Sequence, residues 1–229
     1  MTDTTKKTVN IAIDGPSGAG KSSLAKGLAA RFGIVYVDTG ALYRTVGLYA
    51  ARLNITLENI GAIRRFLCGL RVTLRHEGDG QHVYLFDEDV TGYIRTPEIS
   101  MYASAVSALP EVRAFLLETQ RSIARTTSVV MDGRDIGTVI LPDADVKFFL
   151  VANDVKRAER RLAELRAKGM EITLEEVLSD MAKRDENDRT RDTAPAIAAE
   201  DAILLDNSDM TSAETVEAAS AIILQKLGA

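Results

Sequence analysis

Short apolar runs alternate with longer amphipathic stretches along most of the chain. In the amphipathic stretches the apolar residues recur at helical spacing, as Leu24, Leu28 and Phe32 do. The apolar runs are rich in β-branched residues and are predicted as buried strands at 9–14, 34–37, 128–131, 146–151 and 202–205. Strands that alternate with helices indicate parallel βαβ units. We therefore expect an α/β fold with a five-stranded parallel sheet and helices on both faces.

Two regions depart from this alternation. Residues 71–94 contain short strand-like runs, RVTLR, HVYLF and DVTGYI, separated by glycine and aspartate, which predicts a small antiparallel β insert. Residues 154–168 and 174–191 are long, highly charged and helical in pattern. The first region extends the fold with strands, and the second predicts a pair of helices beside the sheet.

The chain contains no low-complexity linker between these regions, so we predict a single domain over 1–229. The predicted core consists of the segments 9–38, 128–153 and 200–229. Residues 39–127 form one insertion, which holds the β insert and further helices at 57–68 and after Pro97 and Pro110. Residues 154–192 form the other insertion.

Composition narrows the class of protein. The net charge is −5 and aromatic residues make up 5% of the chain, which argues against a nucleic-acid-binding protein. No apolar run approaches the roughly 20 residues that span a bilayer, and the N-terminus lacks the apolar segment of a secretory signal. Cys68 is the only cysteine, so no internal disulfide forms, and its apolar neighbours predict that it is buried. We therefore expect a cytoplasmic protein without a membrane or nucleic-acid partner.

A glycine-rich loop follows the first predicted strand. It matches the phosphate-binding pattern G-x-x-x-x-G-K-[ST] with the residues Gly15, Pro16, Ser17, Gly18, Ala19, Gly20, Lys21 and Ser22. Glycines let several backbone N–H groups point inward, and the following helix directs the positive end of its dipole to the same place. Lys21 adds a charge for the outer phosphates, and the Ser22 hydroxyl is a ligand for Mg²⁺. The loop predicts a nucleoside triphosphate site.

Two absences from the sequence distinguish among proteins with such a loop. The chain has no Asn-Lys pair, which the guanine-reading N-K-x-D motif requires, and no Gly-Gly pair of the kind found in the ABC-ATPase signature. These absences favour a phosphoryl transferase that acts on a small molecule. Kinases for acceptors such as UMP, AMP or shikimate remain open at this point, as does a nucleotide-binding module without catalysis.

A candidate acceptor pocket lies at the carboxyl ends of the predicted strands. The polar residues there are Asp38, Thr39, Arg44, Asp132, Arg134 and Asp135. Open α/β sheets bind their ligands at this edge. Each residue also has a purely structural interpretation: Thr39 could only cap a helix, and the arginines could only pair with carboxylates. The coincidence at several strand ends favours a binding site.

Arginines gather in the two charged helical stretches. Arg157, Arg160 and Arg161 share one helix face, and the segment KRDENDRTRD adds Arg184 and Arg191. A solvated charged face is the ordinary interpretation of such runs. Guanidinium groups also bind phosphate oxygens and stabilise the charge of a transferred phosphoryl group, so we predict a mobile lid that excludes water. The candidate catalytic residues are Lys21, Arg134, Arg157, Arg160 and Arg191.

Four stretches of the chain together resemble one family. IDGPSGAGKSS, VDTGALYR, MDGRDIGTVILPDA and KRDENDRTRDTAP are similar, in order and spacing, to the bacterial cytidylate kinases. The resemblance covers essentially the whole chain and implies a P-loop kinase core, a β insert in the monophosphate-binding region 39–127 and a helical lid at 154–192. It implies that ATP and Mg²⁺ are used to convert CMP and dCMP to CDP and dCDP in pyrimidine nucleotide metabolism, by a monomer. UMP is the alternative acceptor.

The resemblance also implies roles for individual residues. Gly15 to Ser23 would hold the ATP phosphates. The CMP pocket would be lined by Thr39, Arg44, Ser104, Arg113, Arg134, Asp135, Arg184, Asp188 and Arg191. The family commonly has serine at the position of Thr39, and the hydroxyl is kept here. Ser22-Ser23 stands where a Gly-Thr or Ser-Thr pair is more usual, so both positions keep a hydroxyl that could meet Mg²⁺; Ser22 is the one expected from the loop motif.

The chemistry of cytosine suggests how its pocket is read. The base offers an amino donor at N4 and acceptors at N3 and O2, so a carboxylate and a guanidinium, Asp135 and Arg113, form a candidate base-reading pair. Uracil places an acceptor against the carboxylate, and unpaired buried polar groups discriminate strongly. Arg44, Arg134 and Arg191 are expected at phosphates. The acceptor is itself a phosphate with a second pKa of about 6, so the reaction needs no general base.

Overall fold

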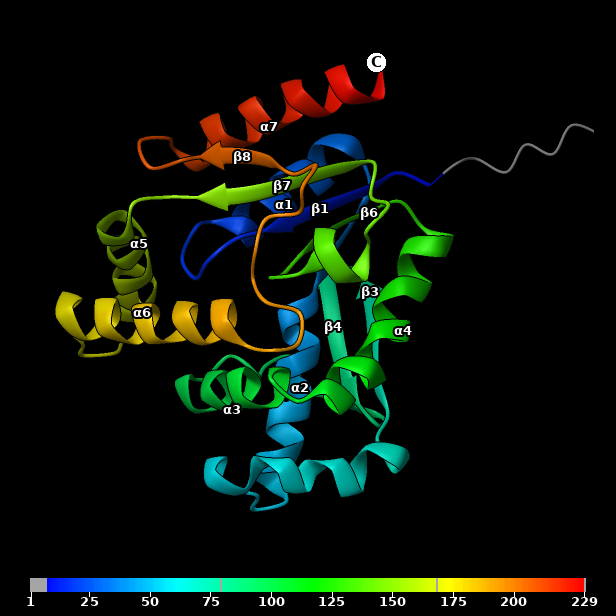
Figure 1. The fold of residues 1–229 in the computed structure, drawn as a ribbon, viewed down its shortest axis with the longest axis vertical. Coiled ribbons are helices and arrows are strands. Elements are labelled where there is room, and N and C mark those ends of the chain that lie inside the picture. Colours follow the sequence, from blue (N-terminus) through cyan, green and yellow to red (C-terminus); the bar gives the residue numbers. More distant parts are fainter. Residues whose placement is uncertain (1–7, 79, 168, 229) are drawn as a thin grey trace, which may run out of the picture.

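The computed structural model describes residues 8–78, 80–167 and 169–228 and confirms the five-stranded parallel sheet (Figure 1). The strand order is β2-β6-β1-β7-β8. Their bounds are Asn10–Asp14 (β1), Val35–Asp38 (β2), Val129–Asp132 (β6), Val146–Val151 (β7) and Ile203–Asp206 (β8). Because β1 is central and pairs in parallel with β6 and β7, the loop that follows it leaves the middle of the sheet edge.

Helices cover both faces of this sheet, as predicted. On one face, α1 (Lys21–Phe32) and α7 (Ser212–Leu227) bury Leu24 and Ile223 against Ile11 and Ile13 of β1. On the other face, α4 (Pro110–Thr126) and the short helix η2 (Ile136–Ile140) pack over Ala12. Successive residues of a strand point to opposite faces. The continuous apolar composition of β1 therefore matches a strand that is buried on both sides.

The two charged stretches form the helices α5 (Asp154–Ala167) and α6 (Leu174–Thr190), which pack side by side (Figure 1). The last predicted residue of the first helix, Lys168, lies outside the described residues. A small apolar cluster of their own joins the two helices, and its buried members are Ala158, Leu165, Val177 and Met181. The two helices therefore form one packed unit.

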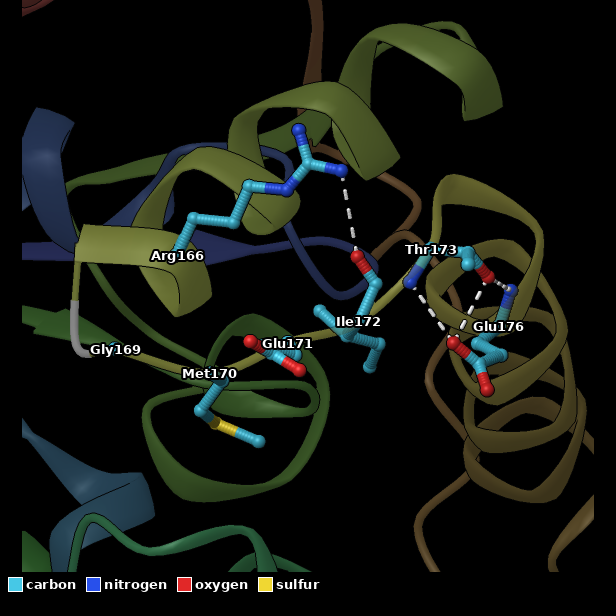
Figure 2. Close-up of a pocket in the computed structure, with 7 residues that line it drawn as sticks. All are labelled: Arg166, Gly169, Met170, Glu171, Ile172, Thr173 and Glu176. Atoms are coloured by element: carbon cyan, nitrogen blue, oxygen red, sulfur yellow. Dashed lines mark hydrogen bonds between the residues drawn. The ribbon is translucent and has the colours of Figure 1, made fainter.

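A shallow pocket of about 590 Å³ lies at the turn between α5 and α6 (Figure 2). Figure 2 shows Thr173 and Glu176 bonding reciprocally, and this capping box begins α6. Across the pocket, Arg166 Nη2 donates to the Ile172 carbonyl over 3.4 Å. No residue predicted for the reaction is among those that line this pocket. The capping box thus begins α6, and the bond from Arg166 holds the turn that joins α6 to α5.

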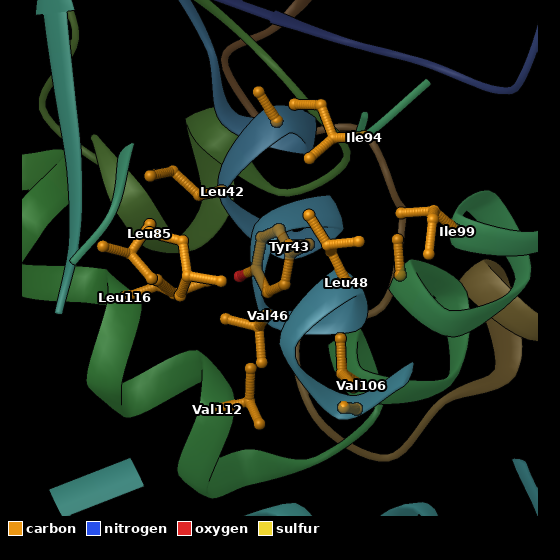
Figure 3. Packing of buried hydrophobic residues seen from close by; sticks show 14 of the residues in the cluster. Leu42, Tyr43, Val46, Leu48, Leu85, Ile94, Ile99, Val106, Val112 and Leu116 are labelled. Carbon is orange, nitrogen blue, oxygen red and sulfur yellow. The ribbon is translucent and has the colours of Figure 1, made fainter. Parts of the chain in front are cut away.

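The region 39–127 has an apolar core distinct from that of the sheet (Figure 3). Its elements are α2 (Thr39–Arg52), η1 (Leu57–Gly69), β3 (Val72–Glu77), β4 (Gly80–Leu85), β5 (Glu88–Asp89), α3 (Pro97–Ser107) and α4. Leu42 and Val46 of α2 point into this core together with Leu85 of β4 and Leu116 of α4. The region therefore carries its own packing, and α2 connects it to the end of β2.

The predicted antiparallel insert is confirmed as the three-stranded sheet β3-β4-β5. Its third strand is shorter than the predicted run 89–94, because pairing stops at Asp89 and the chain then turns. Val90 and Ile94, on either side of this turn, are fully buried in the core of the region.

The helix predicted at 57–68 is a 3₁₀ helix with a kink at Asn59. Ile63 is its only buried residue, and the prediction that Cys68 is buried is wrong, since this side chain is exposed. The apolar neighbours of Cys68 did not imply burial, because Phe66 is itself 39% exposed. None of the helices in the described ranges combines the length and apolar character that crossing a bilayer requires.

Candidate active site

The glycine-rich loop, 15–22, connects the end of β1 to α1. A side chain at Gly15 would collide with the Leu150 carbonyl oxygen of β7, and its φ of 143° also excludes other residues. The loop ends at Gly20, and α1 begins at Lys21, so the first N–H groups of the helix face the loop. This is the arrangement that binds phosphate oxygens.

Lys21 is buried at the mouth of the loop. Its Nζ donates to the Pro16 carbonyl over 2.7 Å, which holds the ammonium across the loop. Burial and the nearby Arg134 guanidinium lower the pKa of Lys21 well below its usual value. Burial and the neighbouring positive charge destabilise the ammonium form of Lys21, and an anionic ligand beside it would stabilise that form.

Asp132, at the end of β6, joins the loop to β2. Its carboxylate accepts from Ser22 Oγ over 2.8 Å and from the Tyr36 hydroxyl over 3.0 Å. Burial, together with the charge of Asp38, raises the pKa of Asp132 to about 6. A hydroxyl and a carboxylate in contact form an oxygen donor set that suits Mg²⁺. Within the described ranges no larger group of His, Cys, Asp or Glu could hold a metal ion.

Asp14 is the last residue of β1, and its side chain binds the segment 133–137 that follows β6. The two carboxylate oxygens accept from the backbone N–H groups of Ile136 and Gly137, each over 2.8 Å. Gly133 N–H is bonded to the neighbouring Ile13 carbonyl. Strand β1 therefore holds the segment 133–137 at both ends. Burial raises the pKa of Asp14 to about 6.

The segment 133–137 presents Asp135 to two arginines. Arg113 of α4 forms a buried ion pair with Asp135, and the guanidinium lies 5.4 Å from the centre of the Tyr43 ring. Arg191 approaches the other carboxylate oxygen at 3.4 Å. Arg113 also donates to the Ser107 carbonyl over 3.2 Å. Asp135 thus pairs with one arginine at each of its two carboxylate oxygens.

Arg134 and the helix α6 form the opposite part of the site. Arg134 Nε donates to Asp188 over 2.8 Å, and Arg134 Nη2 donates to Ser17 Oγ over 3.0 Å. Burial alone would raise the pKa of Asp188, but Arg134 and Arg184 hold it below its usual value. Burial and the charge of Arg134 lower the pKa of Arg184 to about 10. The Nε of Arg184 is buried without a hydrogen-bond partner among the described residues.

Asp38 organises the end of β2. It accepts from Arg95 over 2.9 Å, lies 3.7 Å from Arg44, and caps α2 through the Ala41 N–H. The interpretation of Thr39 as a helix cap is wrong, because Asp38 is the cap and Thr39 donates to the Asp132 carbonyl over 2.8 Å. The Nη1 of Arg44 is buried and has no hydrogen-bond partner in the described part of the chain.

A cavity of about 1340 Å³ brings most of the predicted residues together. It is lined by every residue predicted for the acceptor, namely Thr39, Arg44, Ser104, Arg113, Arg134, Asp135, Arg184, Asp188 and Arg191. We call residues 15–23, the predicted ATP-phosphate site, the donor loop. Its members that line the cavity are Ser17, Gly18, Gly20, Lys21, Ser22 and Ser23. Gly15, Pro16 and Ala19 of the same loop do not line the cavity. The cavity therefore opens onto both predicted sites.

Two predicted catalytic arginines are engaged by other groups. Arg160 lines the cavity but donates to the Asn207 carbonyl over 2.7 Å, on the loop after β8. Arg157 is buried outside the cavity lining and pairs with Asp154 and Asp185. Their catalytic roles stay predictions.

The sequence reasoning missed several residues of this site. Arg95 lines the cavity, and Asn207 donates to the Ala19 carbonyl over 3.0 Å. Neither residue belongs to a recognisable sequence motif. Only the folded structure brings Arg95 into the cavity lining and Asn207 to the glycine-rich loop. Asp14 and Asp185 lay inside quoted stretches, but sequence alone did not show which backbone groups they reach.

Comparisons with known proteins point to one family. The sequence profile described as "Cytidylate kinase" matches residues 11–225. The protein named "Cytidylate kinase" from Caldanaerobacter subterraneus subsp. tengcongensis is 51% identical over 210 residues, which is 92% of either chain. Those of the same name from Carboxydothermus hydrogenoformans and Caldicellulosiruptor saccharolyticus are 47% and 43% identical, over 95% and 97% of this chain and 98% of each of theirs.

Similarity to solved structures is weaker. A shikimate kinase from Bacteroides thetaiotaomicron aligns with 97% of this chain and 100% of its own at 13% identity, with a TM-score of 0.47. That degree of similarity does not bear on the reaction.

Proposed function

The chain belongs to the cytidylate kinase family and phosphorylates CMP and dCMP, and we propose how its residues carry out this reaction. The donor loop 15–23 binds the phosphates of ATP through its backbone, and the nine acceptor residues bind the monophosphate. An oxygen of the CMP phosphate forms a bond to the γ-phosphorus while the bond from that phosphorus to the bridging oxygen breaks. The products are CDP and ADP.

One observation carries this proposal: the acceptor residues and the donor loop line the same cavity. Two of its guanidiniums, Arg44 and Arg184, have a buried nitrogen without a hydrogen-bond partner among the described residues. A buried donor without a partner is costly, and a phosphate oxygen supplies the missing acceptor. We assign Arg44, Arg134 and Arg191 to phosphates, and Arg184, Asp188 and Ser104 to the phosphate and pentose side of the nucleotide.

The pair Asp135 and Arg113 reads the base. The carboxylate accepts from the N4 amino group and the guanidinium donates to N3 and O2. Both side chains are buried and already paired with each other, so little reorganisation is needed when cytosine binds. UMP is the alternative acceptor, and its O4 would face the Asp135 carboxylate without a proton between them.

Catalysis is by positioning and electrostatics. The CMP phosphate is largely dianionic at neutral pH, since its second pKa is about 6, and it attacks without a general base. Lys21 and the arginines, Arg134 and Arg191, stabilise negative charge as it spreads over the transferred group. Arg160 and Arg157 belong to the lid that keeps water from the same group.

Ser22 and Asp132 are the residues that would hold Mg²⁺. Their contact provides a hydroxyl and a carboxylate, and the burial that raises the pKa of Asp132 favours a cation beside it. When bound, Mg²⁺ neutralises charge on the phosphate oxygens of ATP. We further propose that the chain works as a cytoplasmic monomer, which size-exclusion chromatography with light scattering would test.

Measurement of ADP release from ATP and Mg²⁺ with CMP, dCMP, UMP, AMP and shikimate, each offered separately, tests these assignments. We expect fast turnover with CMP and dCMP and slow turnover with UMP. Equal turnover of CMP and UMP would contradict the role of Asp135 and Arg113. Turnover confined to another acceptor would contradict the whole acceptor assignment.

A further inference from the structure

All three polar groups of Ser17, in the donor loop, are engaged by distant residues. Its N–H donates to Asp185 Oδ1 over 2.8 Å, and its carbonyl accepts from Arg157 Nη1 over 2.6 Å. Its hydroxyl accepts from Arg134, as described above. Asp185 and Arg157 belong to α6 and α5. Each helix of the lid thus reaches the same residue of the donor loop.

The three residues close a ring, which we call the lid latch. Arg157 Nη1, besides its contact with Ser17, donates to Asp185 Oδ2 over 2.6 Å. Arg157 Nη2 donates to Asp154 over 2.7 Å. The Arg157 side chain is 7% exposed and that of Asp185 is 19% exposed, so these contacts are largely shielded from water. Shielded, charge-assisted hydrogen bonds fix geometry more firmly than surface pairs do.

The latch lies beside a close contact between the lid and the loop. A Cβ at Gly18 would stand 2.8 Å from Met181 Cε and 2.9 Å from the Arg157 carbonyl oxygen. Met181 also belongs to the apolar cluster that joins α5 to α6. Since that cluster makes the lid one packed unit, holding it at Ser17 sets the place of both helices.

The position of Asp185 in α6 links the latch to the cavity. Arg184 precedes it directly, and Asp188 follows about one helical turn later. Both of these neighbours line the cavity, whereas Asp185 does not. A shift of α6 along or about its axis would move Arg184 and Asp188 together.

We propose that Asp185 is a positioning residue that seats the lid on the donor loop through Ser17, so that Arg184 and Asp188 stand at their places over the acceptor. This inference rests on the proposed function, because it assigns the cavity to the acceptor. Asp185 touches no substrate. Its hydrogen bond with Ser17 fixes where α6 lies relative to the donor loop, and α6 carries the residues that hold the acceptor.

Kinetic analysis of Asp185→Ala and Asp185→Asn tests the proposal. We expect Asp185→Ala to lower kcat with CMP by about tenfold to a hundredfold, because a displacement of about 1 Å of aligned groups has an effect of this size. KM for ATP should change by less than about threefold, since the donor loop is kept, whereas KM for CMP should rise because Arg184 and Asp188 are displaced. Asp185→Asn should recover part of the loss, because its amide oxygen still accepts from Ser17 N–H.

A second readout is ADP formed without any acceptor. If the lid is loosened, water reaches the donor site, and the ratio of this ADP to the CDP made with CMP should rise. Glu186→Gln is the matched control: it is the next residue of α6, and its carboxylate pairs with Arg189 on the surface. This control should match the parent in both readouts.

A double-mutant cycle tests the ring itself. Arg157→Lys keeps the positive charge but cannot bond Ser17, Asp185 and Asp154 at once. Because all these contacts share one ring, the effects of Arg157→Lys and Asp185→Asn on kcat should be less than additive. Fully additive effects would show that the two residues act separately.

Three further results would overturn the proposal: an unchanged kcat in Asp185→Ala, a rise of both KM values at constant kcat, or equal losses in Asp185→Asn and Glu186→Gln. Melting curves of every variant show whether a loss is one of folding. The parent protein separates this inference from the proposed function. If the parent turns over CMP while Asp185→Ala matches it, the latch fails alone; if the parent makes no CDP, the proposed function fails.

Discussion

The donor loop and the acceptor cavity meet at one edge of the sheet but are built in different ways. The loop is one stretch of chain, 15–23, and its predicted contacts with phosphate come mainly from the backbone. The acceptor cavity takes its side chains from α2, α3, α4, α6 and the segment 133–137. Those side chains hold one another by charge, as Arg113 and Asp135 do, and Arg134 and Asp188. The loop therefore depends on backbone geometry, and the cavity depends on a balance of charges from distant elements.

Replacing the one essential side-chain charge of the loop should have the largest effect. Lys21→Ala should lower kcat by about a thousandfold, because a buried charge aimed at the transferred group is lost from a site where water cannot replace it. Steady-state kinetics with saturating CMP measures this. Lys26→Ala, on the exposed side of the same helix, is the control and should leave kcat unchanged. A loss of less than tenfold in Lys21→Ala would contradict the role of its ammonium.

Asp14 connects the two regions, and its titration should be visible in stability. Its pKa is about 6 in the folded protein and 3.8 in the reference state, so the folded state holds a proton that the unfolded state has released between about pH 4 and 6. As the pH rises through this window, the free energy of unfolding should therefore fall, and Asp14 contributes up to about 3 kcal/mol of this fall. In Asp14→Asn this contribution is absent.

Urea denaturation across this range measures the difference between Asp14→Asn and the parent. The free energy of unfolding of the variant, relative to the parent, should rise between pH 4 and pH 7. Equal urea m-values would show that both proteins expose the same surface when they unfold. Parallel curves with no relative rise would contradict the burial of an ionised carboxylate at Asp14.

A change at Asp135 from a hydrogen-bond acceptor to a group that can also donate should alter which base the acceptor cavity prefers. Asp135→Asn replaces an acceptor by an amide that also donates, so it favours the O4 of uracil over the N4 amino group of cytosine. The ratio of kcat/KM for CMP to that for UMP should fall by about thirtyfold, the effect of one charge-assisted hydrogen bond. Asp87→Asn, in an exposed pair with Arg71, is the control. A uniform loss for both nucleotides would show that the change disturbs packing rather than base choice.

The smallest effect is expected where the β insert reaches the site. Gln81 of β4 accepts from the Asp38 N–H over 2.8 Å and donates back to the Asp38 carbonyl over 3.4 Å. Gln81→Ala should raise KM for CMP about threefold and leave KM for ATP unchanged, since both neutral hydrogen bonds to the backbone of Asp38 are lost and Asp38 lies beside Arg44. Gln225→Ala on α7 is the control. Equal changes in both KM values would contradict a separate acceptor region.

The contrast between the two regions also explains what the sequence could predict. The sheet was predictable because its strands are short, apolar and β-branched, and the loop was predictable because its function needs consecutive residues. The acceptor residues are spread from Thr39 to Arg191, and no periodicity connects them. Resemblance to a family supplied that list, and their binding roles stay predictions.

Other features depended on contacts that no local pattern encodes. Arg157 had the spacing of a residue facing the phosphates, yet it lies in a ring with Asp185 and Ser17. Cys68 stood among apolar residues, yet a 3₁₀ helix turns it outward. In each case the outcome depends on partners distant in sequence or on helix type, and neither follows from the order of residues nearby.

The separate apolar core of the region 39–127 has a consequence for how such an enzyme changes over time. Leu42, Val46 and Leu116 pack among themselves, away from the residues that support the donor loop. We therefore expect substitutions in this cluster to change the shape of the predicted acceptor site, while the residues that pack behind the donor loop keep their contacts. Single substitutions in this core are therefore expected to change the acceptor preference gradually, while the binding of ATP is preserved after each one.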